Sequence, residues 1–160
     1  MFRPYVNLPR QVHLLCLGML IQRAGTFVLP FLSLYLTQRL GFSYQTATGA
    51  VAMLGLGTVT GALVGGHLAD HIGRRRVAIM ALVGGAAIMA SLQFFSAVAA
   101  VYIGVFLLTA VADMYRPASQ AMIADLTTPA QRPYAYGLVY LAINLGFPIG
   151  AMIAGVVSKY

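Results

Sequence analysis

Three charged residues fall inside otherwise apolar stretches of the sequence: Arg23, Asp113 and Arg116. A charge at the middle of a bilayer costs at least about 2.5–3.5 kcal/mol, so such residues usually face a cavity or one another. Asp113 and Arg116 are spaced i, i+3 and share one face if a single helix carries both. We therefore predict a charged cavity site formed by all three. An internal ion pair that only holds helices together is the alternative interpretation.

The predicted site contains two cations and one anion, so one arginine is left to bind an anionic group of a substrate or to hold Asp113 ionised. Neighbouring cations favour the ionised form of a carboxyl group, which argues against Asp113 as a proton carrier without excluding that role. Polar residues in the same stretches can add contacts to the cavity, and hydrogen bonding between helices is the alternative for each of them. These residues are Gln120, Tyr140 and Asn144.

Other chemistry finds little support in the sequence. No nucleophile–base pair, phosphate-binding loop or metal motif is apparent, so we predict neither an enzyme nor a cofactor. His67 and His71 flank Asp70, but they stand in a short turn without further ligands nearby, and no metal site is expected there. The single Cys16 excludes an internal disulfide.

The composition indicates an integral membrane protein. Of the 160 residues, 60% are hydrophobic and 8% are charged, whereas a soluble domain carries about 25% charged residues. A water-soluble fold of this size cannot cover its surface with so few charges. The net charge of +7 is assigned to membrane orientation rather than to nucleic-acid binding, because the basic residues lie mostly at the ends of apolar runs.

Five segments are long enough to cross the roughly 30 Å of hydrocarbon in a bilayer. They are expected at about 12–36, 44–69, 77–95, 97–126 and 134–157. Pro117 interrupts the fourth segment, because it cannot donate to the carbonyl of Asp113 and should kink the helix. The connections are short, so neighbouring helices are expected to run antiparallel. The predicted fold is an all-α, polytopic membrane bundle of five transmembrane helices.

The distribution of basic residues predicts the orientation. With the N-terminus in the cytoplasm, six basic residues lie inside and two lie outside, as the positive-inside rule requires. The inside residues are Arg3, Arg10, Arg74, Arg75, Arg76 and Arg132, and the outside ones are Arg39 and Lys159.

Small residues recur at four-residue intervals in two of the segments. Gly57, Gly61 and Gly65 form a stripe along the second, and Gly146 and Gly150 begin another in the fifth. Close backbone approach at such faces drives much of the association between helices in lipid. We predict that each stripe packs on a partner helix. The alternative is that glycine is simply common in membrane helices.

The stretch "GHLADHIGRRR", Gly66 to Arg76, joins the second and third segments. A basic cytoplasmic turn explains its arginines, and Gly73 permits a tight turn, but topology does not explain Asp70. The stretch resembles the signature between the second and third helices of the major facilitator superfamily. "RPASQAMIAD" (116–125) and "NLGFPIG" (144–150) resemble the end of that family's fourth helix and its fifth helix. The fifth helix also resembles, in part, the Gly/Pro-rich pattern of the drug/proton antiporters.

The resemblance implies a fold and a function. The fold is the N-terminal six-helix bundle of a major facilitator transporter without its last helix, and the missing C-terminal helical bundle is its expected partner. The function is secondary transport of a small molecule, proton-coupled and of the efflux type, in the lipid bilayer of the bacterial inner (plasma) membrane. A truncated gene product or a fragment of a longer chain is expected. The alternative is a non-transporting remnant or a scaffold that binds a partner through its glycine face.

The resemblance also implies a gate on the cytoplasmic side. Asp70 would lie against a helix N-terminus of the opposite bundle, where a carboxylate is favoured. Gly66 would let that helix approach, and Arg74 would bridge to Asp125 at the end of the fourth helix. One departure concerns residues 102–108, which hold no arginine where the family often has one.

Overall fold

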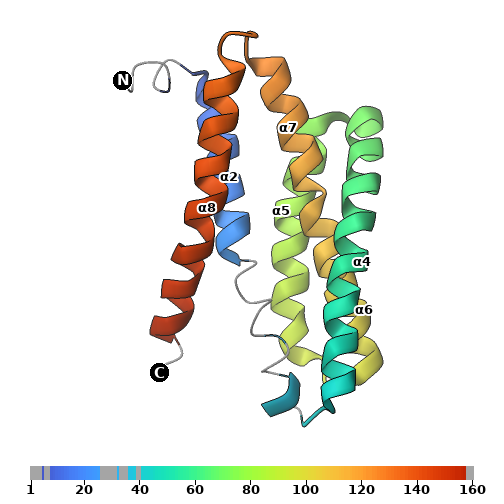
Figure 1. Ribbon diagram of the computed structural model, residues 1–160. Coiled ribbons are helices and arrows are strands. Elements are labelled where there is room, and N and C mark those ends of the chain that lie inside the picture. The colour runs from blue at the N-terminus through green and yellow to red at the C-terminus, as the bar shows by residue number, and fades with distance from the viewer. Residues whose placement is uncertain (1–4, 6–7, 26–31, 33–35, 39–40, 158–160) are drawn as a thin grey trace. The chain divides into compact units, whose positions relative to one another are not determined.

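The computed structural model describes residues 5, 8–25, 32, 36–38 and 41–157. These residues are helical with short connections, and no strand occurs among them. Contacts group the chain into two units, Met1–Val28 with Ser119–Tyr160 and Leu29–Ala118. Figure 1 labels the principal helices, which are α2 (Arg10–Gly25), α4 (Tyr44–Leu68), α5 (Arg74–Ser91), α6 (Val98–Asp113), α7 (Tyr115–Leu126) and α8 (Arg132–Val157).

The most extensive helix contact joins α4 and α6 within the unit Leu29–Ala118. The two helices run in the same direction (Figure 1). Gly49 near the start of α4 lies against Tyr102, and Gly65 near its end lies against Met114 just beyond α6. The hydroxyl of Tyr102 also donates to the carbonyl oxygen of Thr46 at 2.8 Å. This contact therefore fixes the register of α4 on α6 over its whole length.

Glycines allow the two backbones to touch. Gly57 lies against the Thr109 side chain and the Phe106 carbonyl, and Gly61 lies against the backbone of Ala110. A side chain at either glycine would collide with atoms of α6. The contact is thus made by backbone atoms, which is the geometry that small residues permit between membrane helices.

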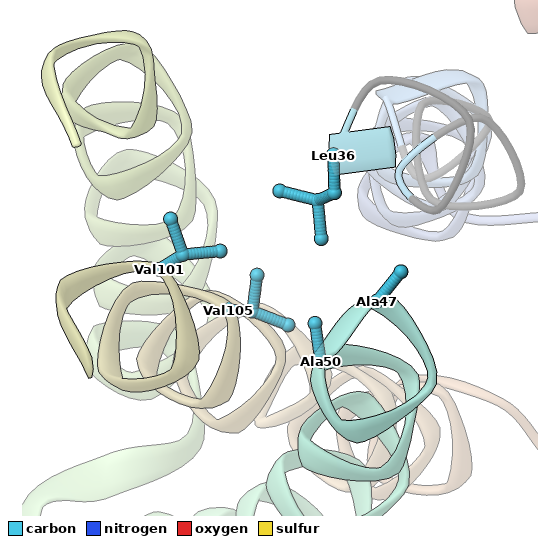
Figure 2. Packing of buried hydrophobic residues seen from close by; sticks show 5 residues of the cluster. All are labelled: Leu36, Ala47, Ala50, Val101 and Val105. Carbon is cyan, nitrogen blue, oxygen red and sulfur yellow. The ribbon is translucent and has the colours of Figure 1, made fainter. Parts of the chain in front are cut away.

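A small apolar cluster closes one end of the same contact (Figure 2). Ala47 and Ala50 of α4 face Val101 and Val105 of α6, and Leu36 completes the group; each of the five is buried. The alanines keep the helices close, and the branched side chains fill the remaining space.

A π-helical turn, Ala69–Gly73, connects α4 to α5. The chain reverses at Gly73, where φ is +96°. Helix α5 then packs on α6, with Gly85 against Ala112. A short 3-10 turn, Leu92–Phe94, follows α5 and precedes α6.

Three helical stretches are long and apolar enough to cross a membrane: Tyr44–Phe94, Val98–Leu126 and Arg132–Ile153. The first has 51 residues and contains the reversal at Gly73, so it makes two passes. Large apolar side chains cover its outward faces, among them Leu56, Leu63 and Val83, which are more than half exposed. Such surfaces are normal in lipid and are interaction or aggregation sites in water.

In the other unit, α2 and α8 run side by side (Figure 1). Gly146 of α8 lies against the carbonyl of Leu20 and the Cβ of Arg23. Tyr5 and Tyr134 meet edge to face with ring centroids 5.5 Å apart.

The helix bounds differ from the expected ones, and three of the differences concern segments that carry the charged residues. The segment expected over 97–126 is divided at Met114 into α6 and α7, where Pro117 removes a backbone donor. Helix α5 begins at Arg74, three residues before the expected start, so the three arginines lie in its first turn. Of the segment expected over 12–36, α2 accounts for residues up to Gly25, and most of the remainder lies outside the described residues.

The glycine contact predicts a sharp contrast between two substitutions in α4. Gly61→Ala places a Cβ against the Ala110 carbonyl and should lower the free energy of unfolding by about 1–3 kcal/mol, as over-packing does. Gly55→Ala is the matched control, because a Cβ there meets no atom within 4 Å and alanine favours helix by about 1 kcal/mol. Thermal unfolding of the purified protein in detergent measures both, and equal midpoints would contradict the prediction.

Candidate functional site

Asp113 is the last residue of α6 and is buried, with 9% of its surface exposed. The hydroxyl of Thr58 in α4 donates to its Oδ2 atom at 2.7 Å. Among the described residues, Thr58 is the side chain that hydrogen-bonds this carboxylate. A buried carboxylate without such a partner would be strongly destabilising, so this hydrogen bond is what makes Asp113 tolerable inside the α4–α6 contact.

The end of α6 at Asp113 follows from Pro117. Proline at this position has no N–H for the Asp113 carbonyl, and its ring collides with that carbonyl in a regular helix. At the break, the Met114 N–H bonds to the carbonyl of Val111 at 3.3 Å, and α7 starts at Tyr115. The break thus places the buried carboxylate at a helix end.

Arg116 does not share a helix with Asp113. The i, i+3 spacing predicted a common face, but the break at Met114 puts Asp113 at the end of α6 and Arg116 in the first turn of α7. Asp113 is buried and Arg116 is exposed. The shared face of Asp113 and Arg116 stays a prediction, because Met114 between the two helices keeps helical backbone angles.

Arg23 lies in the last described turn of α2 and is half-buried. It belongs to the unit of α2 and α8, whereas Asp113 belongs to the unit Leu29–Ala118. Its Cβ packs against Gly146, so that glycine admits the base of the arginine side chain. Gly150, one turn further along α8, is buried as well.

The polar residues expected at a cavity are exposed. Asn144 donates through Nδ2 to the carbonyl of Tyr140 at 2.7 Å, a bond within its own helix. Tyr140 itself is 70% exposed. Gln120 accepts a bond of 3.4 Å at its backbone carbonyl from the hydroxyl of Tyr136. The hydrogen bond of the Asn144 amide is therefore a local one rather than a bond between helices.

The stretch expected to form a gate lies almost entirely in helix. Gly66 is in α4, where an added Cβ would meet nothing within 4 Å. Asp70 projects from the π turn and is exposed, and Arg74 opens α5 with partial exposure. Gly73 has a backbone angle that other residues rarely adopt. Both Gly66 and Asp70 thus present accessible surface at this hairpin.

The proposed partner of Arg74 lies in the other unit. Asp125 is exposed near the end of α7. The neighbouring Arg132, at the start of α8, donates through Nη2 to the carbonyl of Ala124 at 3.2 Å. This bond ties the start of α8 to the end of α7.

The two histidines of the hairpin lie together. Their ring centroids are 4.1 Å apart, and the Nδ1 atom of His71 is 2.8 Å from the carbonyl oxygen of His67. Within the described part of the chain, no group of three or more His, Cys, Asp and Glu side chains is arranged to hold a metal ion.

Thr58 is the functional candidate that the sequence did not suggest. Its signal was a hydroxyl residue beside Gly57, the first residue of the glycine stripe. A polar side chain next to a predicted backbone contact has only the partner helix or its own helix to bond with. That reasoning identifies Thr58 as a candidate, but pairing it with Asp113 requires the register of α4 on α6.

Comparisons with known proteins identify the family to which this chain is similar. The family model described as Major Facilitator Superfamily matches residues 14–160. The uncharacterized MFS-type transporter YttB of Bacillus subtilis (strain 168) is 31% identical over 155 residues, covering 96% of this chain and 38% of the relative. The uncharacterized MFS-type transporter YqjV of the same organism is 26% identical, covering 86% and 34%.

A third similar protein is the Na(+), Li(+), K(+)/H(+) antiporter of Planococcus maritimus, which is 28% identical over 81% of this chain and 31% of the antiporter. No solved structure matches. The chain spans about a third of the length of these relatives. Together with the apolar helices, the matches identify a multi-pass membrane protein.

The hairpin predicts opposite effects at its two glycines. Gly73→Ala forces alanine into a conformation with φ of +96° and should cost of order 1–3 kcal/mol of stability. Gly66→Ala is the control, because that position is helical and has open space around it, and it should leave stability unchanged or slightly higher. Thermal unfolding of both variants in detergent measures this difference in stability. A Gly73→Ala variant as stable as Gly66→Ala would refute the strained turn.

Proposed function

Because this chain belongs to the major facilitator superfamily, we propose that it forms part of a secondary transporter that exchanges a small molecule for protons. Members of this family move small-molecule substrates across membranes. The single observation that carries the proton-coupling proposal is the buried Asp113 carboxylate held by Thr58. Ionisable residues inside membrane helices mark ion and proton pathways.

The partner of Asp113 opposes proton binding less than a cation would. A cation beside this carboxylate would favour its ionised form and oppose protonation. The hydrogen-bonding partner is instead a neutral hydroxyl, which adds no positive charge beside the carboxylate. The name of one relative, an antiporter that couples alkali cations to protons, favours the same type of exchange. Sodium, potassium and lithium ions are therefore the first substrates to test.

Arg23 supplies the second charge of the proposed site. It is half-buried on α2, where α8 packs closely against it at Gly146. In the longer transporter Arg23 would line the central cavity, together with residues of the family's second bundle. Alternating access in this family rests on two bundles that rock around a site at the midplane, so the proposal concerns the protein in which both are present.

The hairpin between α4 and α5 would act as the cytoplasmic gate. Asp70 is exposed there, and Gly66 leaves open space beside it, as a docking helix of the other bundle requires. The balance of basic residues supports a cytoplasmic location for this hairpin and for the N-terminus. The membrane proposed is the plasma membrane of a bacterium. The direction of transport proposed is efflux.

The scaffold alternative is less well supported. It requires a glycine face that is available to a partner protein, but the stripe on α4 already packs against α6 of the same chain. A second protein would have to displace α6.

The charged site predicts that transport depends on both Asp113 and Arg23. In the complete transporter reconstituted into vesicles, Asp113→Asn and Arg23→Ala should each reduce exchange at least a hundredfold while expression and folding persist, because each removes the charge that the site uses. An internal pH-sensitive dye, read after addition of sodium, potassium or lithium ions, measures the exchange. Arg10→Ala is the control, since Arg10 lies exposed at the start of α2. Normal exchange by both site variants would refute the proposal.

The gate predicts a kinetic effect at Asp70. Asp70→Asn should slow the transport cycle about tenfold while the affinity for substrate changes less than twofold, because the carboxylate would stabilise only the closed cytoplasmic side. Rates come from vesicle flux and affinities from equilibrium binding of the same protein. His67→Gln, in the same exposed hairpin, should behave like the parent. An unchanged rate for Asp70→Asn would count against the gate.

A further inference from the structure

We propose that Thr58 is a positioning residue that lets Asp113 take up and release a proton while the α4–α6 contact stays closed. The inference rests on the proposed function of Asp113 as the proton-binding carboxylate. It adds a residue that is not part of the charged site and assigns it a specific task.

The hydroxyl of Thr58 behaves differently from its neighbours in α4. Thr48 and Thr60 donate to the carbonyl four residues earlier in their own helix, at 2.9 and 2.8 Å. Thr58 instead donates across the helix contact to Asp113 at 2.7 Å. Of these three threonines, Thr58 is therefore the one whose hydroxyl bonds across the helix contact.

A hydroxyl both donates and accepts, which makes the pair compatible with both charge states of Asp113. When the carboxylate is ionised, the Thr58 hydroxyl donates to Oδ2, as observed. When a proton binds a carboxylate oxygen, the new O–H group can donate to Oγ1 of Thr58, since a hydroxyl also accepts. One proton is gained from outside the pair, and no covalent bond in the protein breaks. An arginine side chain has no acceptor, so it could not accept a hydrogen bond from the protonated carboxyl group.

The packing on both sides of the pair favours a proton over a larger ion. Gly57 precedes Thr58 and Gly61 follows it by three residues, and at both the α4 backbone touches α6. A metal ion between Thr58 and Asp113 would have to push these backbones apart. A proton adds no volume, so the contact can persist throughout the cycle. Protonation of Asp113 would then require no movement of α4 against α6.

The test is a pH titration of the complete protein in lipid, followed through the infrared band of the protonated carboxyl group. The Asp113 band is the one that Asp113→Asn removes. Thr58→Val keeps the shape and removes the hydroxyl, so the ionised carboxylate loses a donor. The midpoint of the Asp113 band should move to higher pH by about one unit, a tenfold gain in proton affinity. Thr58→Ser should restore the parent midpoint.

Thr60→Val is the matched control, because Thr60 bonds only within α4 in the described structure, and its midpoint should equal that of the parent. If valine prevents folding, Thr58→Ala removes the same hydroxyl. If a Thr58 variant without the hydroxyl has the same Asp113 midpoint as Thr60→Val, this inference is wrong. The proposed function would then remain intact. If Asp113→Asn removes no titrating band, the proposed proton site fails, and the role of Thr58 fails with it.

Discussion

The close approach of the α4 and α6 backbones is the constraint on which the rest of this helix unit depends. In lipid no hydrophobic force favours one helix contact over a contact with lipid chains, so association relies on packing and hydrogen bonds. Glycines at Gly57 and Gly61 bring the two backbones into contact, which maximises packing and permits weak Cα–H···O bonds. Because atoms touch at several successive turns, the register between the helices is fixed. That register is what sets Thr58 opposite Asp113.

The burial of Asp113 is a consequence of where this contact ends. Helix α6 stops at Asp113 because of Pro117, and the α4 contact continues as far as Gly65 against Met114. The carboxylate is therefore enclosed by a tight contact at a broken helix end. Its desolvation costs several kcal/mol unless it is hydrogen-bonded, and a hydrogen bond to a charged group contributes about 1.5–3 kcal/mol. The hydroxyl offsets a large part of the cost, which is why a neutral partner suffices.

Much of the helical architecture could be predicted from the sequence, because it follows from local patterns. Apolar length indicated the helices, and the turn at Gly73 needed only the backbone freedom of glycine. What could not be predicted depends on contacts between helices or on the detailed path of the backbone. The pairing of Thr58 with Asp113 requires a register that no local spacing contains. The exact place of the break, at Met114 between Asp113 and Arg116, likewise depends on the backbone path near Pro117.

The start of α5 shows a conflict between two electrostatic effects. Arg74, Arg75 and Arg76 occupy its first turn, where the helix dipole disfavours each cation by about 0.3–1 kcal/mol. We expected these arginines in a basic turn before the helix. At the surface of an anionic leaflet, however, each basic residue gains about 1 kcal/mol. At the cytoplasmic location proposed for this hairpin, such a gain would offset the cost at the helix end. Helix α5 begins directly after Gly73 without an acidic residue in its first turn.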